Sequence, residues 1–195
     1  MGKITAAALL LVGSLLCINA CWLPAKAWLS QQLIHYSWQQ AMAIKTSRLD
    51  SQGSQVVIKP WPWADTFPIA ELTFQRLKKN IVVLNGGDPT TLAFSAGAVA
   101  PYNQTHASKP FVVAGHRDSH FAFLADVILK DVIDLTNSRG QAKKYQVQSI
   151  DIVDASLGQL PLPADESMLV LITCYPFNGL NSNANQRYVI YAKAI

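Results

Sequence analysis

An uncharged apolar stretch near the N-terminus limits most strongly what this chain can fold into. It runs from Ile4 to Leu23, twenty residues without one charged side chain. A helix of about 20 apolar residues crosses the hydrocarbon core of a bilayer, with every backbone hydrogen bond made inside the segment. Lys3 precedes the stretch and Lys26 follows it, and the amino terminus adds charge on the first side. We therefore expect a signal anchor over residues 1–25, with its N-terminus in the cytoplasm and the rest of the chain outside.

A cleaved export signal is the alternative for this stretch. Ile18-Asn19-Ala20-Cys21 loosely resembles a lipoprotein cleavage box, and Ala25-Lys26-Ala27 resembles a small-residue cleavage site. The apolar stretch is longer than the roughly 7–15 residues of a signal-peptide core, which favours an anchor that is kept. Both alternatives export the remainder of the chain.

Residues 26–55 are expected to form an amphipathic juxtamembrane helix and a linker. Apolar residues recur there at spacings near three and four, namely Trp28, Leu29, Leu33, Tyr36, Met42 and Ile44. Ser51-Gln52-Gly53-Ser54 is typical of a short linker. Residues 56–195 then remain for one domain, which is long enough to bury a core of its own.

Short apolar segments separated by turn residues fill this domain. Asn85-Gly86-Gly87-Asp88-Pro89 and Asn137-Ser138-Arg139-Gly140 are turn signals. The spacing is typical of a β-barrel, and we predict strands over 69–74, 81–84, 111–114, 132–135, 145–153, 168–173 and 187–192. The phase of the apolar residues slips between Val147 and Ile150, which predicts a β-bulge.

Cys174 directly follows an apolar strand, a place that suits a nucleophile. Cys17 and Cys21 lie in the apolar N-terminal stretch, so Cys174 is the only thiol of the exported part and no disulfide can form within that part. An unpaired thiol in an oxidising compartment is exposed to oxidation, and a nucleophilic role is a sufficient reason to keep it.

His116 and Arg187 have the chemistry that such a thiol needs. A thiol with a pKa near 8.5 requires a proton partner or a cation to supply thiolate, and imidazole serves as both. Arginine keeps its charge and holds a developing oxyanion with a fixed fork of donors. If the last two strands are antiparallel neighbours, Cys174 and Arg187 face each other across the loop from Tyr175 to Gln186.

These segments resemble a known family. Leu171-Ile172-Thr173-Cys174 and Ala114-Gly115-His116-Arg117-Asp118 resemble the cysteine and histidine motifs of sortases. Further agreement lies in Trp61-Pro62-Trp63-Ala64-Asp65, Leu92-Ala93-Phe94, the whole of Val113 to Leu124, Cys174-Tyr175-Pro176-Phe177 and Arg187-Tyr188-Val189. Taken together, these segments are most similar to the sortases of Gram-negative bacteria, called class GN. The resemblance covers roughly residues 60 to 195.

The resemblance implies a fold, an activity and partners. The fold is a mainly β, closed and mostly antiparallel barrel of about eight strands with short helices. The activity is that of a membrane-anchored cysteine transpeptidase in the periplasm. It cleaves an LPxTG-like sorting signal near the C-terminus of a secreted protein and transfers the product to an amine acceptor. No cofactor or metal takes part in the chemical step.

The resemblance also assigns residue roles. Cys174 becomes the nucleophile, His116 the proton donor and Arg187 the ligand of substrate and oxyanion. Supporting or substrate-binding candidates are Thr173, Asp118, Arg117 and Tyr175. Arg117 and Asp118 either orient His116 or cap the turn that follows it, and Thr173 is explained equally well as a β-branched strand residue.

Other functions fit the residues less well. An L,D-transpeptidase also uses Cys, His and Arg, but places its Cys shortly after the His, whereas here 58 residues separate His116 from Cys174. A peptide-binding barrel without activity is the non-enzymatic alternative. Zinc binding by His116 and His120 is disfavoured, because no third ligand accompanies the pair. The net charge of +4 comes from scattered Lys and Arg, so nucleic acid is not expected as a partner.

Overall fold

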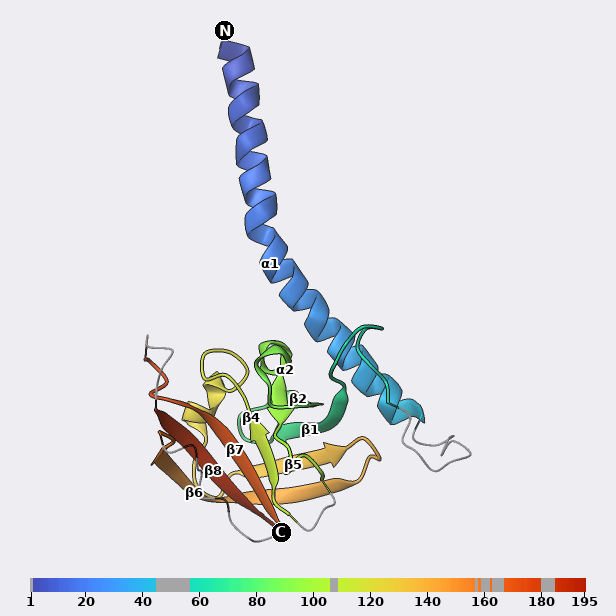
Figure 1. The fold of residues 1–195 in the computed structure, drawn as a ribbon, viewed down its shortest axis with the longest axis vertical. Coiled ribbons are helices and arrows are strands. Elements are labelled where there is room, and N and C mark those ends of the chain that lie inside the picture. Colours follow the sequence, from blue (N-terminus) through green and yellow to red (C-terminus); the bar gives the residue numbers. More distant parts are fainter. Residues whose placement is uncertain are drawn as a thin grey trace.

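Eight strands close into a β-barrel, and a long N-terminal helix leads up to it (Figure 1). The computed structural model describes residues 2–44, 57–105, 109–156, 158, 162, 167–179 and 185–195. The strands are β1 (Pro68–Phe74), β2 (Lys79–Asn85), β3 (Ala96–Ala98), β4 (Phe111–Ala114), β5 (Val132–Asn137), β6 (Ala142–Asp154), β7 (Met168–Tyr175) and β8 (Gln186–Ala194). Their order around the barrel is β1-β2-β3-β4-β7-β8-β6-β5. Only the β2–β3 and β4–β7 pairings are parallel, which confirms the predicted mostly antiparallel closed barrel.

Local sequence patterns predict seven of these strands, and all seven form. The pairing of β6 with β8 shifts register between Val147 and Ser149, so the predicted bulge is confirmed. The patterns do not predict β3, because Ala96-Gly97-Ala98 has no β-branched or aromatic residue. Its neighbours β2 and β4 supply the pairing that makes it a strand.

Alternating side chains fill the interior of the barrel. Strand β1 alternates between buried and half-buried residues along its whole length, as a strand with one core face should. The interior cluster includes Leu72, Phe74, Val113, Phe121, Leu171 and Ile190. Removal of these apolar side chains from water is the main force that closes the barrel.

The N-terminal helix α1 (Gly2–Ile44) is continuous through both of the segments that we distinguish in the sequence. By length and composition, it is apolar enough to cross a membrane. Its ribbon curves along its length (Figure 1), and Pro24 inside it cannot donate the hydrogen bond of its turn. The predicted linker Ser51–Ser54 lies outside the described residues.

The C-terminal part of α1 packs on the barrel with a different face from the one expected. Ile34 and Trp38 are buried against Val82 and Leu84 of β2, with Met42 beside them. The expected stripe is therefore wrong in part, because Trp28, Leu29 and Tyr36 are exposed. Apolar residues lie on several sides of this helix, so local spacing alone cannot select the buried side.

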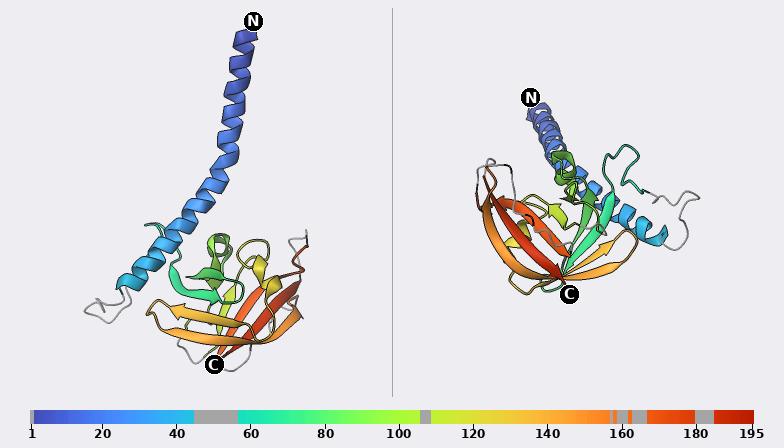
Figure 2. Two further views of the ribbon diagram at one scale, coloured as in Figure 1. Left: turned by 180° about the vertical axis from the view of Figure 1, so that it is seen from behind. Right: turned by 60° about the horizontal axis from the view of Figure 1, so that its bottom comes forward.

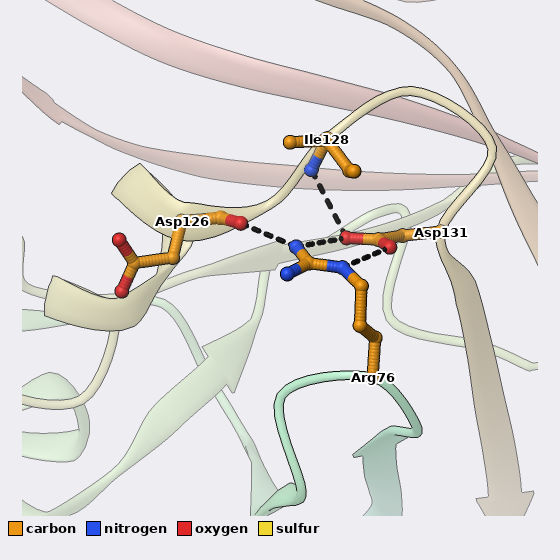
Figure 3. A network of polar contacts seen from close by, with 4 residues as sticks. All are labelled: Arg76, Asp126, Ile128 and Asp131. Carbon is orange, nitrogen blue, oxygen red and sulfur yellow. Dashed lines mark hydrogen bonds and ion pairs between the residues drawn. The ribbon is translucent and has the colours of Figure 1, made fainter.

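Two short helices and an ion pair shape the loops. Helix α2 (Pro89–Phe94) begins after Asp88, whose carboxylate accepts hydrogen bonds from the backbone N–H groups of Thr90 and Thr91. The 3₁₀ helix η1 (Ala122–Asp126) follows β4. Figure 3 shows how Arg76 of the β1–β2 turn reaches the segment after η1. Its Nε and Nη2 donate to the Asp131 carboxylate at 2.6 and 2.8 Å, and this contact lowers the pKa of Asp131.

Candidate active site

Strands β4 and β7 end side by side at one edge of the barrel. They pair in parallel from Phe111 opposite Leu169 to Ala114 opposite Ile172, a constant offset of 58 residues. The Gly115 N–H donates to the Ile172 carbonyl at 3.1 Å, which carries the pairing one residue further. His116 therefore leaves β4 level with Cys174. We call this edge, where β4 and β7 end and β8 begins, the site edge.

The third candidate faces the cysteine across the next pairing. Strands β7 and β8 are antiparallel, and Cys174 stands directly opposite Arg187. This confirms the expectation that the two residues face each other across the loop from Tyr175 to Gln186. Cys174 and Arg187 are both half-buried, and His116 is exposed.

The structure also decides which faces of the two strands match. Val170 and Ile172 of β7 pack with Val189 and Tyr191 of β8 in one buried cluster outside the barrel interior. Alternation along each strand puts Cys174 and Arg187 on the face of this cluster. The sequence predicts each stripe but not that the two stripes lie together.

Thr173 points to the opposite face from Cys174 and ties the two strand ends together. Its side chain is buried, with 2% of its surface exposed, and its hydroxyl donates to the Gly115 carbonyl at 2.8 Å. Gly115 itself is required by packing, because an added Cβ would lie 2.7 Å from the ring of buried Phe121. The backbone on both sides of His116 is therefore held by close contacts.

Arg117 connects the turn after β4 to the segment after β7. Its Nη2 donates to the Gly179 carbonyl at 2.7 Å, across 62 residues of sequence. The turn is closed by the Phe121 N–H, which donates to the His116 carbonyl at 2.9 Å. Asp118 is exposed in the same turn. Arg117 thus reaches the loop beyond Cys174, which sequence spacing does not indicate.

Aromatic rings stand on the other face of the strand ends. Tyr175 stacks on Tyr188 with ring centroids 6.3 Å apart, and Phe177 meets Tyr188 edge-on at 5.0 Å. Tyr188 and Phe177 pack against the barrel interior, and burial raises the pKa of Tyr188. Tyr175 therefore closes the barrel beside Cys174 rather than lying on the face of the thiol.

His120 lies deeper than His116 in the same turn. Burial lowers the pKa of His120, and the nearby His116 adds to the lowering, while a hydrogen bond to the Ala93 carbonyl and the charge of Asp118 oppose it. Within the described part of the chain, no group of three or more His, Cys, Asp or Glu side chains is arranged to hold a metal ion.

Comparison with known proteins agrees with this arrangement. The chain matches the family model of the sortase domain over residues 72–195. The chain belongs to the sortase family. Sortase D of Bacillus subtilis (strain 168) is 27% identical over 125 residues, which make up 64% of this chain and 62% of the relative. The match thus spans less than two thirds of that sortase.

Solved sortase structures share the fold. The Clostridium perfringens sortase D5 transpeptidase superposes with a TM-score of 0.66 at 16% identity, covering 84% of this chain and 99% of that one. The catalytic domain of SrtD from B. anthracis gives a TM-score of 0.54 at 29% identity, over 76% of this chain and 96% of that one. Sortase A from Corynebacterium diphtheriae gives 0.58 at 20% identity, over 85% and 84%.

Sequence reasoning misses two contacts of this sortase site, those of Thr173 with Gly115 and of Arg117 with Gly179. A signal for the first exists in the sequence. The same offset of 58 residues separates the apolar segments 111–114 and 169–172 and also separates His116 from Cys174. That repetition indicates a parallel pairing, but only once the two segments are known to be neighbours.

Proposed function

We propose that this sortase-family chain is a membrane-anchored cysteine transpeptidase that acts on an LPxTG-like signal near the C-terminus of a secreted protein. The observation that carries the proposal is the strand register. It pairs Cys174 with Arg187 and sets His116 level with Cys174 at the same edge. Family membership supports the class of reaction.

In the proposed reaction, the thiolate of Cys174 attacks the carbonyl carbon of the signal threonine. The guanidinium of Arg187 stabilises the negative charge that develops on the carbonyl oxygen. Protonated His116 gives its proton to the nitrogen of the departing glycine, so the C–N bond breaks and a thioester to Cys174 remains. An amine acceptor then attacks the thioester, loses a proton to His116 and releases the thiolate.

The neighbouring residues take supporting roles in this proposal. Thr173 holds the end of β7 against Gly115, and Arg117 holds the turn of His116 against the loop after β7. Tyr175 and Asp118 line the site edge, where they contact the substrate or the histidine turn. The remaining selectivity for the sorting signal lies in the loop from Tyr175 to Gln186.

Membrane attachment and class complete the proposal. We place the apolar part of α1 in the inner membrane as a single span, with the N-terminus in the cytoplasm and the barrel in the periplasm. The exposed apolar side chains of α1, such as Leu9, Leu10 and Leu16, support this placement. The motifs around His116 and Cys174 support membership of class GN within the family.

The test is intact-mass spectrometry of the full-length chain in detergent micelles with LPxTG-type peptides. We expect a thioester adduct that turns into ligated peptide when an amine is added. Cys174→Ala should abolish the adduct, whereas Cys21→Ala in α1 is the matched control and should keep it. Arg187→Lys keeps the charge but loses the fork of donors, so adduct formation should slow by about 10–100-fold.

Two negative results have different meanings. If Cys174 reacts with a small alkylating agent but no peptide adduct forms, the nucleophile is accessible and the assigned signal is wrong. If Cys174 reacts with neither, the transpeptidase proposal fails and the barrel is better explained as a peptide-binding domain.

A further inference from the structure

A polar pocket lies between α1 and the barrel, away from Cys174. It has a volume of about 180 Å³, and its polar lining residues are Gln31 and His35 of α1, Lys79 and Asn80 of β2, Ser95 and His120. None of the described residues that line it is an acid. A pocket with an ammonium group, two imidazoles and amide groups, and no carboxylate, has the chemistry of a phosphate site.

Hydrogen bonds hold the walls of this pocket in place. The Gln31 side-chain amide donates to the Phe94 carbonyl, and the Ser95 hydroxyl donates to the Val82 carbonyl at 2.6 Å. His120 bonds to the Ala93 carbonyl. Helix α1, helix α2 and the His116 turn thus meet at one braced site, with Lys79 and His35 exposed at its rim.

The pocket opens at the edge of the barrel that faces the anchor. Strand β2 is parallel to β3, which is antiparallel to β4, so β2 begins with Lys79 at the edge where β4 ends. The N-terminal part of α1 rises on this side, whereas the chain ends with β8 at the opposite edge (Figures 1 and 2). The pocket and the site edge therefore both face the end of α1 that we place in the membrane.

The depth of the pocket matches a layer of lipid headgroups. Exposed apolar side chains continue along α1 to Trp28 and Leu29, which are 65% and 51% exposed, as expected for the boundary of a bilayer. Gln31 follows two residues later, about 3 Å along the helix axis. A headgroup layer is roughly 5–7 Å thick on each side of the hydrocarbon core, so the first lining residue stands within it.

We propose that the pocket formed by His35, Lys79 and His120 binds the phosphate group of a membrane phospholipid and so couples the membrane surface to the turn that carries His116. This inference rests on the membrane placement of α1 and not on the transpeptidase chemistry. His120 is four residues from His116 in a turn closed by the Phe121 N–H. A phosphate held by His120 and Lys79 would fix that turn against α1.

Protonation of His120 provides the readout. Burial and His116 lower its pKa, Asp118 opposes them, and Lys79 and His35 face the same pocket. A bound anion favours the charged imidazole, so phosphate binding should raise the pKa of His120. The pKa of His35 should rise as well, because it shares the pocket.

The experiment follows the histidine NMR signals of the full-length chain in dodecylmaltoside micelles. Phosphatidylglycerol is titrated in, with diacylglycerol of the same chains and inorganic phosphate as separate arms. We expect phosphatidylglycerol, and not diacylglycerol, to raise the pKa of His120. Lys79→Gln should weaken the effect about fivefold, in line with a partly exposed charged contact. Lys144→Gln, an equal charge change on exposed β6, is the control and should leave it unchanged.

Three results would overturn the proposal. They are no shift of His120 with phosphatidylglycerol, an equal shift with diacylglycerol, or an effect of Lys144→Gln as large as that of Lys79→Gln. A shift with inorganic phosphate but not with phosphatidylglycerol would remove the membrane as the source. Thioester formation, measured on the same samples, separates these failures from a failure of the proposed catalysis.

Discussion

Replacement of Thr173 by valine tests whether the contact between the ends of β4 and β7 holds the site together. Valine keeps the shape of threonine but removes the hydroxyl that donates to the Gly115 carbonyl at 2.8 Å. A typical hydrogen bond stabilises a fold by about 1 kcal/mol, and a buried carbonyl left without its partner costs about 1–3 kcal/mol. We therefore expect the free energy of unfolding to fall by about 1–2 kcal/mol in Thr173→Val.

Thr173→Ser is the matched variant, because it keeps the hydroxyl and loses one methyl group. Burial of one such group contributes about 0.8 kcal/mol, so serine should be less destabilising than valine. The Gly115 carbonyl immediately precedes His116, so the loss of the bond should also slow thioester formation more in Thr173→Val than in Thr173→Ser. The slowing is expected because a loosened strand end displaces the histidine relative to Cys174.

Urea titration of the full-length chain in micelles, followed by near-ultraviolet circular dichroism, measures the stability. Intact-mass time courses with the peptide measure the rate of thioester formation. Valine as stable and as active as the unmodified chain, or serine as damaging as valine, would refute the reasoning. The first result would mean that the hydroxyl contributes nothing, and the second that the methyl group matters instead.

Three further substitutions probe other parts of the molecule. Asp131→Asn should lower stability at pH 7; because Arg76 lowers the pKa of Asp131 below 3.8, the advantage of the native chain should shrink as pH falls below about 4, as urea titrations across pH would show. Gly97→Ala puts a Cβ 1.9 Å from the Gly86 carbonyl oxygen, so thermal unfolding should reveal a loss of about 1–3 kcal/mol. Trp38→Ala removes a side chain that is 4% exposed and should weaken docking of α1 by about 3 kcal/mol, with faster hydrogen exchange confined to the docked end of α1; uniform acceleration through β7 would contradict this.

Long apolar patterns are the part of the fold that local sequence predicts well. Strands β7 and β8 appear as apolar runs between turn residues, and the bulge of β6 appears as a slip in phase. The buried face of α1 does not appear in this way. Ile34 and Trp38 become the docking face because Val82 and Leu84 of β2 offer them a partner surface. Spacing within one helix carries no information about that surface.

The sequence by itself determined the kinds of element in this protein and the residue types at its candidate site. Side-chain alternation and turn residues are local, so strands and the order His116, Cys174, Arg187 can be taken from short windows. Only the tertiary structure decided that Cys174 stands opposite Arg187 and level with His116. It also decided that α1 docks beside the His116 turn. Strand pairing and helix docking join residues far apart in the chain, and their register is chosen by the burial of the whole core rather than by any local preference.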